Sequence, residues 1–109
     1  MVVNILGTDY TVEKKTSSQD ACLLECDGYC DKTSKRIVVA EKEEGCNLDF
    51  FDVYQKKVLR HEIVHAFFYE SGLAENWEHK AIGQEETVVD WFAIQGVKIY
   101  DAWKQADCI

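Results

Sequence analysis

Apolar and polar residues alternate along the N-terminal part of the chain in a way that is typical of strands and turns. Residues 2–6 and 10–14 flank a Gly-Thr-Asp turn and predict an opening β-hairpin. Residues 29–31 and 36–40 flank a polar turn and predict a second hairpin, in which Arg36–Ala40 is rich in β-branched residues. Between the two hairpins, Ser17 or Ser18 can cap a brief helix.

Further along the chain, the apolar period changes from two to between three and four, which predicts helices. One long helix should end near Gly72, and a polar, glycine-bounded loop should cover residues 72–84. A second long helix should follow. The predicted inner face of the first helix contains Phe51, Tyr54, Val58, His61, His65 and Phe68, and that of the second contains Glu86, Asp90, Ala93, Val97 and Tyr100.

These elements predict a single α+β domain that spans residues 1–109. Two small hairpins should form a twisted antiparallel sheet, with one short helix between them and two long C-terminal helices. The chain has no run of apolar residues long enough for a membrane span and no signal-like start, so we expect a cytoplasmic protein.

The net charge and the cysteine content limit the classes of partner and of site that the protein can have. A formal net charge of -8 repels nucleic-acid backbones and anionic lipid, so we expect neither a nucleic-acid partner nor a membrane partner. The five cysteines cannot all pair with one another within one chain, and in a reducing compartment we expect them to be free. Cys22, Cys26 and Cys30 have a spacing that would permit metal binding, but the chain offers no second cysteine pair.

The stretch His61-Glu62-Ile63-Val64-His65 carries the strongest chemical signal. Two histidines four residues apart on a helix project from the same side and can hold one metal ion. Glu62 lies about 100° around the helix from His61, where its carboxylate could act as a base toward a metal-bound water. Zinc in such a site lowers the pKa of its water to roughly 7, and the hydroxide can then attack a carbonyl.

A catalytic zinc needs a third protein ligand, and the acidic face of the second long helix is the place to look. Glu86 is the better candidate, because Asp90 one turn later could accept the second ring N–H of a zinc-bound histidine. Glu85 is a rival ligand on a different face of the same helix, and His79 is a rival from the loop. The motif does not continue with the glycine and third histidine of metzincins.

Together, the HEIVH and EETVVDWFA stretches resemble the gluzincin metallopeptidases. The similarity is closest to the compact ImmA/IrrE-like and minigluzincin-type proteins, which phages and mobile elements often encode. The resemblance implies His61, His65 and Glu86 as zinc ligands, Glu62 as general base and Asp90 as the partner of His61. It also implies that a strand ahead of the active-site helix pairs with an extended peptide, and Ile37, Val38 and Val39 are the residues that match.

We therefore expect a zinc-dependent peptidase that hydrolyses a protein or peptide substrate by means of a zinc-bound water that Glu62 activates. A regulatory protein partner would fit the small size of the domain. Tyr69, Tyr100 and His79 are local candidates for an oxyanion donor. The alternative is a zinc-stabilised, latent or non-catalytic regulatory or interaction module. A third hypothesis is a metal-free scaffold. It would need a cation such as Arg60 or Lys98 to neutralise the acidic face of the second long helix.

Overall fold

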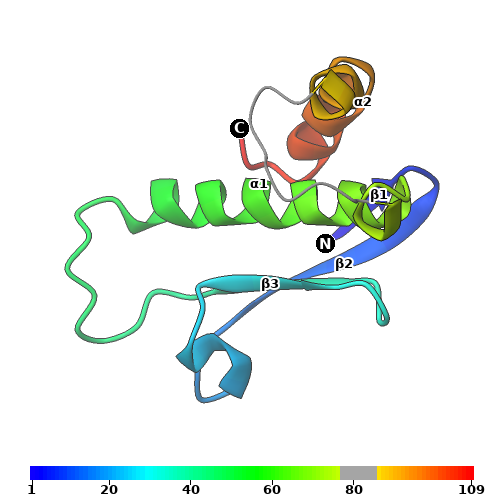
Figure 1. The fold of residues 1–109 in the computed structure, drawn as a ribbon. Helices are drawn as coiled ribbons and strands as arrows, with labels where there is room; N and C mark the ends of the chain where they lie inside the picture. Colours follow the sequence, from blue (N-terminus) through cyan, green and yellow to red (C-terminus); the bar gives the residue numbers. More distant parts are fainter. Residues whose placement is uncertain (77–85) are drawn as a thin grey trace.

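The computed structural model describes residues 1–76 and 86–109, apart from the side chains of Glu86, Val89 and Ala93. Figure 1 shows one sheet whose face is crossed by the long helix α1, with α2 on the other side of that helix. The helices are α1 (Phe51–Glu70) and the C-terminal α2 (Glu86–Gln105). A short 3-10 turn, η2 (Ala74–Asn76), follows α1. Within the described part of the chain, no helix is long and apolar enough to cross a membrane.

The opening hairpin consists of β1 (Val2–Ile5) and β2 (Thr8–Lys15), which pair antiparallel as predicted. Its turn is Leu6-Gly7 rather than the predicted Gly-Thr-Asp stretch. Both turn residues have positive φ angles, 51° and 94°, as the tight turns that match the twist of a hairpin require. Thr8 and Asp9 therefore belong to the strand.

The sheet is mixed, which corrects the prediction of a purely antiparallel sheet. Strands β3 (Gly28–Asp31) and β4 (Arg36–Ala40) form the second antiparallel hairpin, but β4 pairs parallel with β2. The strand order is β1-β2-β4-β3. The chain passes through β3 at the far edge before it returns as β4, so β4 runs in the same direction as β2. Its central residues Ile37, Val38 and Val39 are almost fully buried, which is typical of a strand covered on both faces.

The short helix between the hairpins is the 3-10 turn η1 (Ala21–Leu24), and its cap is Asp20. The carboxylate of Asp20 accepts a hydrogen bond from the backbone N–H of Cys22 at 3.1 Å. The prediction that Ser17 or Ser18 caps this helix is therefore wrong. Asp20 lies directly before the turn, where a short side chain can reach the free backbone donors.

Helix α1 has the predicted bounds, but its buried face is rotated from the predicted one. The residues that it buries are Val58, Leu59, Glu62, Ile63, Ala66 and Phe67. His61 is exposed and His65 is half-buried, so the two histidines lie at the margin of the packed face and not at its centre. Near the C-terminal end of α1, Glu70 accepts hydrogen bonds from Tyr10 at 2.7 Å and from Lys35 at 2.6 Å, which tie the helix to the sheet.

Helix α2 packs through a face that the sequence did not predict. Ile99 and Ala102 are buried, and the indole N–H of Trp103 donates to the backbone carbonyl of Arg60 at 3.3 Å. Val97 and Tyr100, which were expected on the inner face, are 71% and 51% exposed. Asp90 is exposed as well. The predicted inner face is therefore wrong for its described side chains Asp90, Val97 and Tyr100.

Gly28 allows β3 to approach α1 closely. A Cβ atom at this position would lie 2.8 Å from Cγ1 of Val58 and 3.0 Å from the backbone oxygen of Val38. The first contact is with a buried side chain of α1 and the second is with backbone, so neither can move freely. The short separation between β3 and α1 therefore depends on the absence of a Cβ atom at Gly28.

We predict that Gly28→Ala lowers the free energy of unfolding by about 1–3 kcal/mol, the usual cost of overpacking a core. Urea unfolding measures this change. Gly96→Ala is the matched control, because its Cβ would meet only Phe92 at 3.6 Å and alanine favours a helix interior. If the clash with Val58 is the cause, Val58→Ala should offset part of the loss. Equal stability of Gly28→Ala and wild type would contradict the account.

Candidate metal centre

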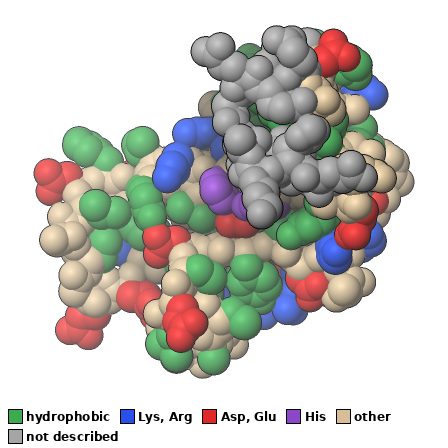
Figure 2. All heavy atoms as spheres, viewed as in Figure 1, with side chains coloured by type: hydrophobic (Ala, Val, Ile, Leu, Met, Phe, Trp, Pro, Cys, Tyr) green, Lys and Arg blue, Asp and Glu red, His purple; other side chains and the backbone are tan. Residues whose placement is uncertain are grey.

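His61 and His65 point their rings at the same place beside α1. Their Nε2 atoms are 3.1 Å apart, and their ring centroids are 4.8 Å apart with an interplanar angle of 72°. The helix produces this pairing because residues four apart lie one turn from each other on the same side. Figure 2 shows histidine atoms at the molecular surface, next to acidic side-chain atoms.

The spacing of the two nitrogens fits a shared metal ion. Zinc binds imidazole nitrogen at about 2.0–2.1 Å with tetrahedral angles, which places two such nitrogens roughly 3.3 Å apart. The observed 3.1 Å differs from that value by an amount that small ring rotations can supply. The ligand atoms of His61, Glu62 and His65 all lie within 4.8 Å of one another, and these residues form the grouping that could hold a cation among those the structure describes.

Glu62 contributes a buried carboxylate to this grouping. Its side chain is only 6% exposed, because it lies on the packed face of α1. No described residue donates a hydrogen bond to it or forms an ion pair with it. Burial raises the pKa of Glu62, and the nearby His61 opposes that rise. A buried carboxylate is costly without a compensating charge, so this residue favours a cation in the adjacent space.

The protonation state of His65 also suits metal binding. Burial lowers its pKa below the ordinary histidine value, and the proximity of His61 lowers it further. The imidazole is therefore neutral near pH 7, and neutral imidazole is the form that donates a lone pair to a metal.

Cys26 and Cys30 are close enough to Glu62 for its charge to affect their thiols, but they do not join the grouping. Burial raises the pKa of the Cys30 thiol to about 12, and the charge of Glu62 adds to the effect. Burial also raises the pKa of Cys26, to which Glu62 contributes as well. Both thiols are therefore protonated near pH 7 when no metal is bound. All five cysteines are free, as expected.

Aromatic side chains flank the C-terminal side of the histidine pair, which the sequence reasoning did not anticipate as a unit. The ring of Tyr69 stacks at 6.4 Å from that of His65, and Phe68 meets His65 edge-on at 6.3 Å. Trp91 of α2 packs edge-on against Phe68 at 4.9 Å and donates its indole N–H to Ser71 at 3.1 Å. Phe68 and Tyr69 are three and four residues after His65, and this helical spacing could have predicted that their rings lie beside the imidazole.

The roles predicted for the acidic residues of α2, a third zinc ligand and a partner of His61, stay predictions. The backbone of Glu86 lies in the first turn of α2, but its side chain is outside the described part of the structure, as are Glu85 and His79. Asp90 is exposed and has no described contact with His61. The described residues thus bring together His61, Glu62 and His65, and they leave the third ligand open.

Comparisons of this chain with models of protein families, with curated proteins and with solved structures give no match. The side chains of the site itself therefore carry the indication of function.

We predict that the protein binds one zinc ion at this centre. Zinc at about 1,000 times its Kd should then add about 4 kcal/mol to the free energy of unfolding. Replacement of His61 or His65 by alanine should weaken binding by more than the roughly 10–100-fold that loss of a supporting residue costs. Isothermal titration calorimetry with zinc measures the affinity, and melting with and without a chelator measures the stabilisation.

The cysteines provide the control for that titration, because thiols bind zinc too. Cys22→Ser and Cys26→Ser should leave the high-affinity site intact. The assignment would be contradicted if the cysteine variants lost zinc binding while His61→Ala kept it. The metal would then be bound by the cysteines and not by α1.

Proposed function

We propose that this protein is a zinc-dependent peptidase in which His61 and His65 hold the metal and Glu62 is the general base. The observation that supports this most is Glu62, a 6% exposed residue with no hydrogen-bond or ion-pair partner among the described residues, beside two ring nitrogens 3.1 Å apart. A purely structural metal site has no need of such a base. A metal-free core would leave the carboxylate of Glu62 without compensation among the described residues.

Zinc bound by the two histidines would supply a Lewis acid that polarises a carbonyl and acidifies a coordinated water. The protein supplies the rest of the chemistry. Glu62 takes a proton from the water that attacks the peptide carbonyl carbon, and it delivers that proton to the amine nitrogen as the C–N bond breaks. Burial favours this role, because a raised pKa brings the carboxylate closer to the operating pH.

Glu86 remains our candidate for the third ligand and Asp90 for the residue that orients His61. Both assignments come from the sequence, and the exposure of Asp90 does not add support. Glu85 is the alternative candidate for the third ligand, and substitutions can distinguish the two residues. Glu86→Ala should reduce zinc affinity and Glu85→Ala should not.

The strand proposed to bind the substrate changes from β4 to β3. Ile37, Val38 and Val39 lie in β4, whose two sides are already paired with β2 and β3, so that strand cannot pair with a peptide. Among the described strands, β3 forms the edge of the sheet next to β4, and Gly28 allows it to approach α1 at Val58, one helical turn before Glu62. An extended protein or peptide substrate could add to this edge through backbone hydrogen bonds.

We predict that Glu62→Gln lowers kcat/KM by about 10²–10⁴-fold, the usual contribution of a general base, and leaves zinc affinity nearly unchanged. Glu44→Gln on the exposed loop before α1 is the matched control and should keep full activity. Cleavage of an unstructured peptide library, followed by mass spectrometry with and without chelator, provides the measurement.

Two results would count against a peptidase. Cleavage that survives in Glu62→Gln, or that a chelator does not suppress, would come from another source. A wild-type protein that binds zinc but cleaves nothing in the library would favour the alternative, a zinc-stabilised regulatory or interaction module. A cytoplasmic location and a regulatory partner stay predictions in either case.

A further inference from the structure

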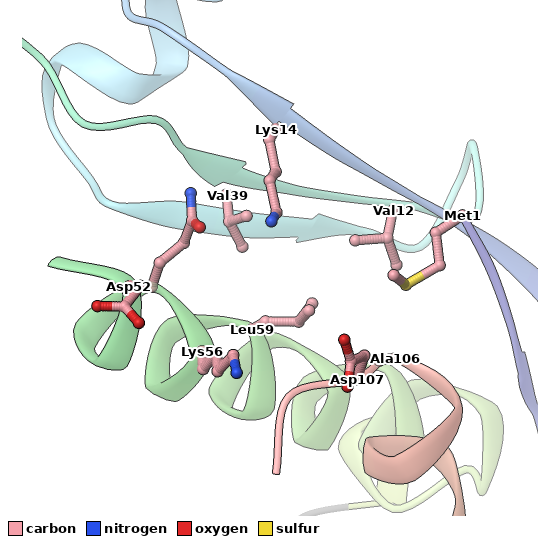
Figure 3. Close-up of a pocket in the computed structure, with 10 residues that line it drawn as sticks. Met1, Val12, Lys14, Val39, Asp52, Lys56, Leu59, Ala106 and Asp107 are labelled. Atoms are coloured by element: carbon pink, nitrogen blue, oxygen red, sulfur yellow. The ribbon is translucent and has the colours of Figure 1, made fainter.

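A second site lies on the opposite side of α1 from the histidines. A cleft of about 410 Å³ opens between the sheet and the N-terminal half of α1, and the turn after α2 bounds it (Figure 3). Helix α1 lines it with Asp52, Gln55, Lys56 and Leu59, which share one helix face. That face is about 150° around the helix from the mean direction of His61 and His65, so the cleft is separate from the proposed metal centre.

The cleft has an apolar floor. Its buried lining residues come from three parts of the fold: Val12 and Val39 from the sheet, Leu59 from α1 and Ala106 from the turn after α2. Each of the four is at most 7% exposed. The other lining residues include polar and charged side chains, and a cleft of this volume that combines buried apolar residues with polar groups can hold a small molecule.

Two lysines approach this floor from opposite walls. Lys14 continues the inward-facing series Tyr10 and Val12 along β2, because residues two apart on a strand share a face. Figure 3 shows its side chain extending from the sheet toward α1. Lys56 comes from α1, one turn before Leu59.

Neither Lys14 nor Lys56 has an ion pair among the described residues. The lysines that do pair are Lys15, Lys32, Lys35 and Lys104. Both side chains are exposed, and two ammonium groups that meet at one cleft without an ion pair favour an anionic ligand there.

Two carboxylates restrict the charge that the cleft can accept. Asp52, one turn before Lys56, and Asp107, in the turn after α2, also line it and have no ion pair within the described part of the chain. They would repel a second negative charge on the ligand. The lining therefore suits a molecule with one anionic head and an apolar body.

We propose that this cleft binds an amphiphilic monocarboxylate, such as a medium-chain fatty acid. Its carboxylate lies between Lys14 and Lys56, and its apolar chain covers Val12, Val39, Leu59 and Ala106. The aliphatic stems of the two lysines add to the apolar contact. This site does not depend on the proposed peptidase function.

Decanoate, kept below its critical micelle concentration, is the probe for this site. Titration into isotopically labelled protein, followed by two-dimensional NMR, should shift the signals of Val12, Val39, Leu59 and Ala106 in a saturable way. Decanol should bind more weakly because it lacks the charge, and decanedioate should bind more weakly because its second carboxylate meets Asp52 or Asp107. His61→Ala should not change the affinity for decanoate.

Substitution of the lysines tests the charge contacts directly. Lys14→Gln and Lys56→Gln should each weaken decanoate binding by about fivefold, the upper range for an exposed ion pair. Lys42→Gln on the exposed loop before α1 removes the same charge elsewhere and should have no effect. The NMR spectra themselves show whether each variant is folded.

Equal affinities for decanoate and decanol, or lysine variants that bind like wild type, would overturn the proposal. Shifts confined to exposed apolar residues of α2 such as Ile94 and Val97 would also overturn it, because they would show unspecific adsorption.

Discussion

The packing of α1 on the sheet is the constraint on which the other features depend. A helix can bury only one face, and the face that buries Ile63, Ala66 and Phe67 also carries Glu62. The rotation of α1 that fills the core therefore also buries Glu62. It leaves His61 and His65 at the margin of the packed face, where both rings can reach a shared ion. Glu70 and Gly28 maintain this rotation, the first through hydrogen bonds to the sheet and the second by allowing close approach.

Much of the fold could be predicted from local signals. The β-branched run at Arg36–Ala40, the turn glycine at position 7 and the helical period after residue 50 place the strands and α1 correctly. The direction of β4 could not be predicted in this way, because it depends on the passage of the chain through the outer strand β3 before β4 joins β2. That long-range pairing makes the sheet mixed and moves the open edge from β4 to β3.

Helix faces were harder to assign than helix bounds. Helix α2 has apolar residues on two sides, Ile99 and Ala102 on one and Ile94, Val97 and Tyr100 on the other, so its period fits either orientation. The packed side is set by what α1 and β1 present to it, including the Trp103 contact with Arg60. In α1, the HExxH spacing brings the side chains of His61 and His65 together because the pairing is local, whereas the third ligand depends on how α2 is placed.

The proposed chemistry requires a metal ion bound between His61 and His65. X-ray absorption at the zinc edge of the zinc-loaded protein tests this most directly, because it distinguishes the ligand types by distance. We expect a first shell of nitrogen and oxygen at about 2.0–2.2 Å with the multiple-scattering pattern of two imidazoles, and no sulfur. A sulfur shell at about 2.3 Å would place the metal on the cysteines and rule out a site between the two histidines.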